Sequence, residues 1–543
     1  MTRFARQGRR RRPRWAVAAA TAATAALLLA GCGGGGDDDR AAQTVTVDWG
    51  EPENPLIPGV TTEQQGGDAI DQLFTGLVRY DPETAAPANA NAESITTTDN
   101  TTFTVRLKPG WTFHDGTPVT AQSYVDAWNW TAYGPNAAQS STFMEKIVGY
   151  DQVASEQPAA PTMSGLRVVD PQTFTVTLKA AFAIFPTTLG YTAYYPLPQK
   201  FFADRAGYEA APVGDGPFRF ESRTPNQNLV LDRYDQYAGD DKAQVQRLEF
   251  RVYDSQQTAY DDLVSGNLDH LKAIPTSALA NDRWKTDLGA GAKQKEGLSI
   301  TTLGFPLYDQ RFANPLVRKA FSMAIDRQAL VAQVSGGLWR AADGLATPAA
   351  QGFVPNQCGE ACTFDPVMAK QLLAQAGGFQ GPLTLTANAD GGHDEWMQAV
   401  TNNLRQNLGI DAQYAPLPSF AEIRRTANAK QYTGLFRAAW IGDYPNLETF
   451  LTQLYRTGAS SNDFGYSNPA VDAALDQADR ATSIPAAEAG YAQAERLVLN
   501  DMPAIPIYSR PIAYGDGRRL TAGERSPLDR LDGSTFALAP QGS

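Results

Sequence analysis

The sequence has few of the residues that most often bind metals or act as nucleophiles. Its 543 residues include only three His and three Cys. The three His residues, His114, His270 and His393, lie far apart. A zinc site needs several such ligands at short spacing, so we expect no metal and no cofactor. The Gly-x-Ser-x-Gly turn of hydrolases and a metal-binding His pair are also absent, so no catalytic residues are predicted.

The chain also lacks an excess of positive charge. Its formal net charge is −12 and its pI is near 4.9. Nucleic-acid partners are therefore not expected, because phosphate binding needs a basic surface. The hydrophobic fraction of 43% and the charged fraction of 19% are typical of globular proteins. The length exceeds what one compact core usually holds, so we expect two or three folded units.

Long hydrophobic runs are missing beyond the N-terminus. The first fourteen residues are rich in Arg, and the apolar run Ala16–Ala30 follows them. This run is too short for a confident membrane span, and a basic segment before a short apolar one is typical of a secretory signal. We therefore predict a signal peptide over residues 1–31. Whether export uses the general or the twin-arginine route stays open.

The signal ends in Leu29-Ala30-Gly31-Cys32, which resembles a bacterial lipobox. The resemblance implies cleavage before Cys32 and lipidation of its thiol, which would anchor the protein to the outer face of the bacterial cell membrane. The Gly- and Asp-rich residues 32–43 are expected to form a flexible tether. The alternative is an ordinary signal peptide with a chance Cys.

The other two cysteines lie four residues apart in a Gly-containing loop. Export to an oxidising compartment permits Cys358 and Cys362 to form a disulfide that closes a small ring. The alternative is a pair of free, buried thiols. We predict the disulfide.

Periodicity predicts an α/β chain with one antiparallel part. Phe103–Leu107 and Phe174–Leu178 alternate apolar and polar residues in similar contexts, so we expect two similar antiparallel strands in one sheet. Apolar residues at helical spacing predict one helix over 314–334, and helices alternate with strands after it. Pro506 within the apolar run Ile505–Tyr508 predicts an edge strand.

One stretch combines an Arg, a Trp and an Asp where a strand gives way to a loop. The segment Tyr432–Phe436 predicts a buried strand, and Gly442–Pro445 is typical of a loop. Arg437, Trp440 and Asp443 lie around this junction, where rigid scaffolds often hold ligand-binding groups.

Four stretches resemble one protein family in the same order along the chain. They are Trp111–Gln122, Gly214–Phe218, Val317–Arg327 and Ala439–Pro445. Together they resemble the family 5 extracellular solute-binding proteins of ABC importers, and among these the oligopeptide-binding lipoproteins. The resemblance extends from about Thr44 to about Tyr514.

The resemblance implies a periplasmic-binding-protein-like fold, in which two lobes enclose the ligand and a third domain is inserted in the first lobe. Carried over, lobe one comprises 44–74, 206–300 and 506–543. The insert comprises 75–205, and lobe two comprises 301–505.

The resemblance also implies roles for individual residues. Asp443 would bind the amino terminus of a peptide, while Trp440 and Ile441 would line the cleft. Gly59 and Val60 match a segment that pairs with the peptide backbone, although Pro58 replaces the acidic residue of the family. Two other matched positions, Arg437 and His393, are implied in binding the peptide carboxylate. Phe420 is a further candidate, for a pocket that holds a peptide side chain.

The function implied is capture of oligopeptides by a monomeric carrier that delivers them to ABC permease subunits. The same carrier role for a dipeptide, nickel complex, sugar or opine stays open, as does a role as sensor or chaperone. A hydrolase built on a carboxylate pair among the 58 acidic residues is the alternative of a different class.

Overall fold

An eleven-stranded mixed sheet is the largest element of the structure, a computed structural model that describes residues 43–389, 392–418, 420–459 and 461–540. The strand order is β15-β14-β16-β12-β17-β11-β1-β10-β9-β8, and β13 pairs with β17 outside this order. The bounds are β1 Thr44–Trp49, β8 Phe218–Thr224, β9 Asn228–Arg233, β10 Arg247–Val252, β11 His270–Leu271, β12 Ala292–Gly304, β13 Arg340–Ala341, β14 Leu383–Thr386, β15 Ala412–Tyr414, β16 Leu435–Ile441 and β17 Ala504–Asp516.

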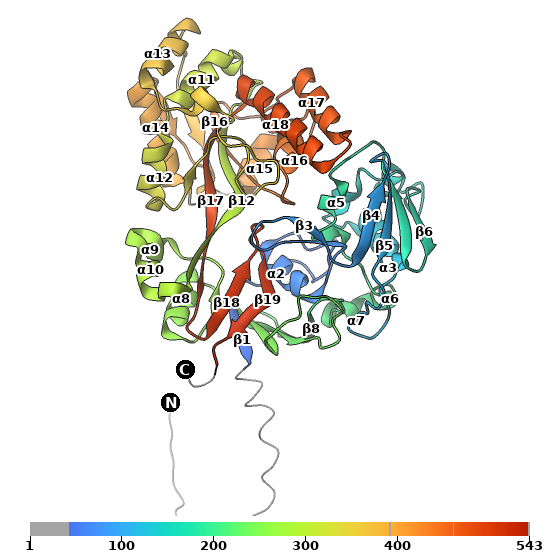
Figure 1. Ribbon diagram of the computed structural model, residues 1–543. Helices are drawn as coiled ribbons and strands as arrows, with labels where there is room; N and C mark the ends of the chain where they lie inside the picture. The colour runs from blue at the N-terminus through green and yellow to red at the C-terminus, as the bar shows by residue number, and fades with distance from the viewer. Residues whose placement is uncertain (1–42, 390–391, 419, 460, 541–543) are drawn as a thin grey trace, which may run out of the picture. The chain divides into compact units, whose positions relative to one another are not determined.

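The two longest strands, β12 and β17, connect the two ends of this sheet (Figure 1). They pair antiparallel from Ala292 opposite Gly515 to Gly304 opposite Ala504. Their register shifts twice, between Lys295 and Ser299 and between Thr301 and Thr302. The predicted boundary between lobes one and two falls inside both strands. That division of the chain stays a prediction, because the described residues from Gln43 on form one unit by their contacts.

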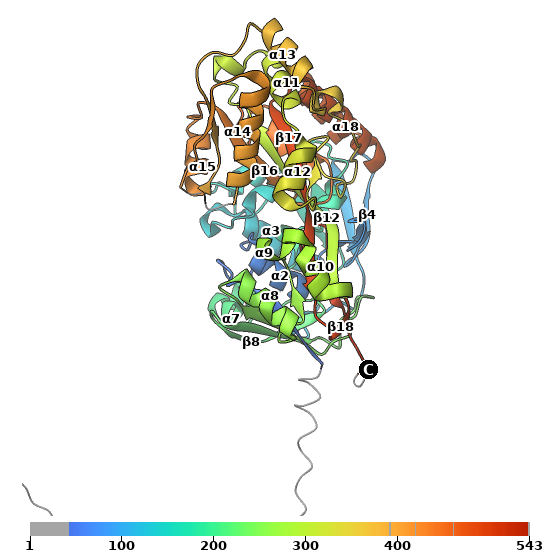
Figure 2. The same ribbon diagram turned by 90° about the vertical axis from the view of Figure 1, so that its left-hand side faces the viewer.

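Helices cover both ends of the sheet. In Figures 1 and 2, α11 to α18 surround the end that holds β14, β15 and β16, whereas α8, α9 and α10 lie beside the far ends of β12 and β17. The helices of the sheet are α2 Gln64–Leu73, α8 Gln256–Ser265, α9 Thr276–Leu279, α10 Arg283–Leu288, α11 Pro315–Met323, α12 Arg327–Ser335, α13 Pro366–Gln375, α14 Asp394–Leu408, α15 Phe420–Asn428, α16 Glu448–Tyr455, α17 Pro469–Asp479 and α18 Ile484–Asp501.

A separate four-stranded antiparallel sheet has the order β4-β5-β7-β6. The two similar strands predicted from the sequence are its central pair, with Phe103 opposite Val176. Thr120 is the N-cap residue of α3, and Trp128 of this helix is fully buried. The elements here are β4 Ala92–Thr97, β5 Thr102–Leu107, β6 Leu166–Asp170, β7 Thr173–Thr177, α3 Ala121–Ala132, α4 Tyr150–Val153, α5 Phe185–Thr188, α6 Gln199–Ala203 and α7 Arg205–Ala210.

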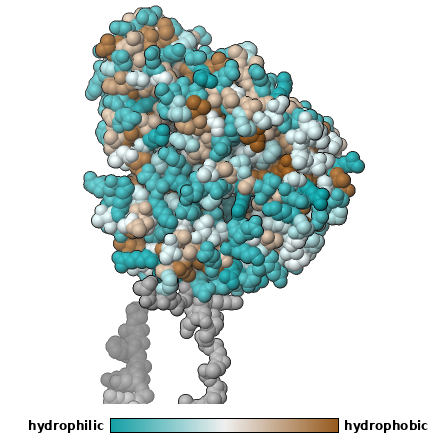
Figure 3. Space-filling model, viewed as in Figure 1, coloured by the Kyte–Doolittle hydropathy of each residue, from teal (hydrophilic) through white to brown (hydrophobic). Residues whose placement is uncertain are grey.

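Two hairpins complete the strands, β2 Val78–Tyr80 with β3 Pro87–Asn89, and β18 Leu520–Arg525 with β19 Leu531–Leu538. On the face shown in Figure 3, hydrophobic residues form small groups among hydrophilic ones. None of the helices in the described ranges combines the length and the apolar character needed to cross a membrane.

The structure contains the predicted disulfide between Cys358 and Cys362, whose Cα atoms are 5.5 Å apart. The ring includes a short 3-10 helix, Gly359–Cys362, and Cys358 is buried. Cys32 and the tether up to Ala42 lie outside the described residues.

The prediction of one helix over 314–334 is wrong, because the chain forms two helices there. Helix α11 ends at Met323 and α12 begins at Arg327. The side chain of Asp326 accepts a hydrogen bond from Ala329 N at 2.9 Å, so it caps the second helix. Apolar spacing continues through the break and therefore conceals it in the sequence.

The prediction of an edge at Ile505–Tyr508 is confirmed locally, although the strand is longer than predicted. These residues belong to β17, which the strand order places between β12 and β11. β11 pairs only with Gly515 and Asp516, and β13 only with Tyr508 and Ser509. Among the strands of the described ranges, Ile505 and Pro506 therefore pair with β12 alone, and a Pro is tolerated on such a locally unpaired edge.

Arg327 connects three segments through a buried guanidinium. It donates to Pro506 O at 2.6 Å, to Ser322 Oγ at 2.6 Å and to Cys362 O at 3.2 Å. Burial lowers the pKa of Arg327 to about 9. The motif that contains Arg327 therefore has a structural role, since it ties α11, the disulfide loop and β17 together.

We predict that Arg327→Met destabilises the protein by about 3–5 kcal/mol, because several buried carbonyls would lose their donor. Arg167→Met is a suitable control, because Arg167 is exposed, and its effect should stay within about 0.5 kcal/mol. Denaturant unfolding of both variants measures the difference. Equal stability of the two would contradict the structural role.

Candidate functional site

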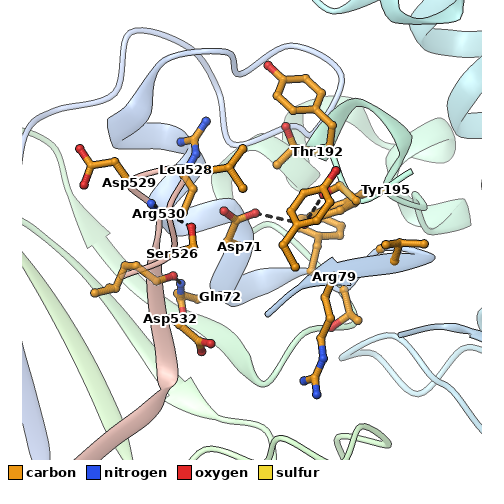
Figure 4. A pocket seen from close by; sticks show the side chains of 18 of the residues that line it. Asp71, Gln72, Arg79, Thr192, Tyr195, Ser526, Leu528, Asp529, Arg530 and Asp532 are labelled. Atoms are coloured by element: carbon orange, nitrogen blue, oxygen red, sulfur yellow. Dashed lines mark hydrogen bonds between the residues drawn. The ribbon is translucent and has the colours of Figure 1, made fainter. Parts of the chain in front are cut away.

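A cavity of ≈330 Å³ lies where the end of β16 meets α2 and the turn between β18 and β19. Its walls come from segments far apart in the sequence, chiefly 71–80, 190–195, 441–443 and 526–534. Figure 4 shows Asp71 pointing toward Tyr195, while Arg530 comes from the β18–β19 turn and Asp532 from the start of β19. The cavity is therefore assembled only in the folded chain.

Asp443 lies at one wall of this cavity, in the loop directly after β16. Its Oδ2 accepts a hydrogen bond from Thr449 Oγ1 at 3.3 Å. The same hydroxyl accepts a hydrogen bond from Trp440 Nε1 at 3.3 Å. Thr449 belongs to α16, so this helix and the end of β16 together hold the carboxylate in place.

The Asp443 carboxylate has no cation to neutralise it. No ion pair joins Asp443 to any Lys or Arg of the described chain, and no cation contributes to its pKa. Burial, together with the nearby Glu448 carboxylate, raises the pKa of Asp443 to about 7, although the hydrogen bond from Thr449 opposes the shift. An ionised carboxylate in such surroundings is stabilised only by a positively charged partner. The cavity wall is therefore suited to a cationic group of a ligand.

Further carboxylates surround the cavity. Burial raises the pKa of Asp71 to about 6, although Arg530 lowers it and Tyr195 OH donates to Asp71 at 3.2 Å. Burial also raises the pKa of Asp532. Arg530 itself donates to Gln64 O at 3.0 Å. The sequence did not point to these residues, because they lie far apart in the chain and belong to no motif.

Strand β16 ends two residues before Asp443, and one of its two edges is largely unpaired. It pairs with β12 from Phe436 to Ile441, but β14 reaches only Leu435 and Phe436 on the other side. Gly442 N donates to Leu298 O at 2.9 Å. By alternation, the backbone N–H and C=O of Ala439 and Ile441 face away from β12. Beyond Phe436, no strand of the described ranges pairs with this edge, so it can accept an added strand.

The predicted cleft residues on β16 separate into two groups. Ile441 lines the cavity, and its side chain is 64% exposed. Trp440 does not line the cavity, since its ring lies on the opposite face and supports Thr449. Its role as a cleft residue stays a prediction.

Arg437 lies at the other end of β16 and outside this cavity. Its guanidinium lies 5.8 Å from the ring centroid of Phe420, which is 48% exposed. Burial lowers the pKa of Arg437, and the neighbouring Arg510 lowers it too. Arg437 forms no ion pair with a carboxylate of the described chain.

His393 and the Gly59–Val60 segment also lie outside the cavity. His393 is buried directly before α14 and accepts a hydrogen bond from Trp396 Nε1 at 3.2 Å. Gly59 O accepts from Ser140 N, and Val60 N donates to Ile57 O. These backbone groups are already used within the protein. Ligand contacts of His393, Gly59 and Val60 stay predictions.

The described residues contain no group of three or more His, Cys, Asp or Glu side chains that could hold a metal ion.

The chain is similar to known binding proteins along most of its length. It is 24% identical over 467 residues to the oligopeptide-binding protein OppA of Bacillus subtilis, covering 83% of this chain and 85% of the relative. It is 28% identical over 466 residues to the periplasmic murein peptide-binding protein MppA of Escherichia coli, covering 83% of each. These relatives are binding proteins and not enzymes.

The fold is similar to that of a solved MppA structure, a periplasmic murein tripeptide binding protein in its unliganded open form. The TM-score is 0.79 at 24% identity, covering 91% of this chain and 97% of that one. This confirms the predicted two-lobed α/β fold. The model of bacterial extracellular solute-binding proteins, family 5, matches residues 86–462. The chain therefore belongs to the family 5 bacterial extracellular solute-binding proteins.

Proposed function

We propose that this protein is the substrate-binding lipoprotein of an ABC importer and that it captures oligopeptides. The observation that supports this most directly is the Asp443 carboxylate, which has no cation and lies at the end of the unpaired edge of β16. A peptide offers the two groups that this arrangement lacks. Its ammonium neutralises Asp443, and its backbone pairs with Ala439 and Ile441.

This mode of binding explains how a carrier accepts many sequences. Main-chain hydrogen bonds to a strand edge supply affinity without reading side chains. The charged end then fixes the position of the ligand, because a buried ammonium without a partner is very unfavourable. The cavity beyond Asp443 provides room at the first residue of the peptide. The names of the two relatives, which describe oligopeptide and murein peptide binding, support peptides as the ligand class.

Delivery requires that the two predicted lobes close over the ligand and then reopen. Strands β12 and β17 are the covalent connection between the predicted lobes, and their register shifts weaken the ladder at two points. We infer that bending occurs there. The closed monomer then docks on the ABC permease subunits. Lipidation of Cys32 keeps the carrier at the membrane, with residues 33–43 as the tether.

We expect N-acetylation of a short peptide to weaken its binding on the order of 100-fold, because the acetylated end no longer carries an ammonium for Asp443. Asp443→Ala should weaken the unmodified peptide to a similar degree. Titration calorimetry with an alanine tripeptide measures both effects. Asp241→Asn is the matched control, since this cavity carboxylate already pairs with Arg79 and should bind normally. Equal binding of acetylated and free peptides would contradict the role of Asp443.

Binding should also depend on pH in one direction between pH 5 and 7. The pKa of Asp443 is raised to about 7, so the empty site is largely protonated at pH 5. Since only the carboxylate pairs with an ammonium, the association constant should rise by up to about tenfold per pH unit and level off near pH 7. It should fall above about pH 8, where a terminal amine loses its proton. In Asp443→Asn the rise between pH 5 and 7 should disappear, and an affinity that falls over this range would refute the assignment.

If Cys32 is the site of the lipid anchor, its substitution should release the protein from the membrane. Full-length protein with Cys32→Ser should appear in the soluble fraction of expressing cells, because it has no acyl chains to hold it. The unchanged protein should sediment with membranes and incorporate labelled fatty acid. Membrane association of the Cys32→Ser variant would contradict the lipid anchor.

A further inference from the structure

The cavity at Asp443 contains more carboxylates than its arginines balance. Its lining includes Arg79, Arg530 and the carboxylates of Asp71, Asp241, Asp443, Asp529 and Asp532. Two of these carboxylates are already paired within the protein. Asp241 forms an ion pair with Arg79. Asp529 accepts a hydrogen bond from Arg525 Nε at 2.8 Å. Three carboxylates therefore remain, and Arg530 is the lining cation left to balance them.

Arg530 does not compensate the three remaining groups, Asp71, Asp443 and Asp532. No cation contributes to the pKa of Asp443. Burial raises the pKa of Asp71 to about 6, and the attraction of Arg530 opposes this only in part. Burial also raises the pKa of Asp532. An ammonium at Asp443 would therefore still leave the cavity one positive charge short.

Asp71 and Asp443 act on the same aromatic side chains of the cavity wall. Burial raises the pKa of Tyr191, and both carboxylates raise it further. Burial also raises the pKa of Tyr80, with smaller contributions from Asp443 and Asp71. Because electrostatic effects weaken with distance, both carboxylates lie near these two rings. A ligand that contacts Asp443 can therefore reach Asp71 as well.

Asp71 has an oxygen available to a ligand. Tyr195 OH donates to Asp71 Oδ1 at 3.2 Å, whereas Oδ2 has no hydrogen-bond partner among the described residues. Figure 4 shows the carboxylate between Arg530 and Tyr195.

The hydroxyl of Thr192 is also unused. Thr192 lines the cavity and is only 5% exposed, yet its side chain forms no hydrogen bond within the described ranges. Because buried hydroxyl groups are normally hydrogen-bonded, we expect a polar group of a ligand there. The cavity thus offers a carboxylate oxygen and a hydroxyl to the same ligand group.

We propose that this cavity binds the first side chain of a peptide and that Asp71 makes it select lysine or arginine at that position. The inference rests on the proposed function, which brings the peptide ammonium to Asp443. The first side chain starts from the carbon that carries this ammonium, so it would enter the cavity. Its cation would pair with Asp71 Oδ2 and donate to the hydroxyl of Thr192, while the flexible stem of lysine adapts to the space.

The test titrates the purified protein by calorimetry with Lys-Ala-Ala and with the same peptide starting in norleucine, which has a similar stem and no charge. We expect the lysine peptide to bind about tenfold or more tightly. The net charge of −12 attracts any basic peptide, so the position of the lysine is the control. Ala-Ala-Lys should show no comparable gain over Ala-Ala-norleucine, because its side chain lies away from the cavity.

Variants assign the preference to Asp71. In Asp71→Asn the preference for lysine should fall to about one, because the lysine peptide loses affinity while the norleucine peptide keeps its own. Asp71→Glu retains the charge and should retain part of the preference. Asp240→Asn is the matched control, since it removes the same charge from an exposed residue outside the cavity, and it should leave the preference unchanged.

Four results would overturn the inference. Equal binding of the lysine and norleucine peptides by the unchanged protein would remove the preference while leaving the proposed function intact. An equal gain from lysine at the first and the last position would mean that overall charge attracts the peptide. A preference that survives in Asp71→Asn would exclude Asp71 as its source. Absence of binding by any peptide would refute the proposed function together with this inference.

Discussion

The pairing of β12 with β17 is the constraint on which the rest of the structure depends. These two strands extend between the two ends of the sheet, and the neighbouring strands are positioned by pairing with them. Strand β12 holds β16 on its other side and so positions the unpaired edge. Strand β17 carries Arg510 and receives the buried Arg327 through the carbonyl of Pro506. The bulge between Pro506 and Tyr508 sets which face Tyr508 and Arg510 occupy. The register of β12 with β17 therefore determines both how this sheet packs and where the candidate binding residues lie.

Asp443 and Arg437 are buried ionisable groups, and neither forms an ion pair within the described chain. Their charged forms are therefore unfavourable when no ligand is bound. Burial raises the pKa of Asp443, and it lowers that of Arg437. Both shifts have the same origin, because a charged group loses hydration and gains no counterion. Under the proposed function, a zwitterionic ligand would supply both missing charges at once. A neutral ligand supplies neither, so the discrimination comes from the cost of leaving the protein groups unpaired.

The sequence predicted local features better than distant ones. The twin strands, the disulfide and the α/β fold are confirmed, because alternation, ring size and motifs act over short stretches. The break after Met323 and the continuation of the Ile505–Tyr508 run into the long strand β17 were missed, since tertiary contacts determine both. Asp443 could be found through its motif. Asp71 and Arg530, on the same cavity, are hundreds of residues apart, and only the folded chain brings them together.

The arrangement of charge along β16 connects the fold with the direction in which a ligand would bind. Acidic groups gather beyond the end of the strand, at Asp443 and Asp71, and Arg437 lies toward its start without a carboxylate partner in the described chain. A strand edge alone accepts a peptide in either direction, since both orientations form hydrogen bonds. Opposite charges at the two ends favour one orientation and disfavour the other by placing like charges together. The backbone edge would thus supply affinity, and the charged ends would supply direction and length.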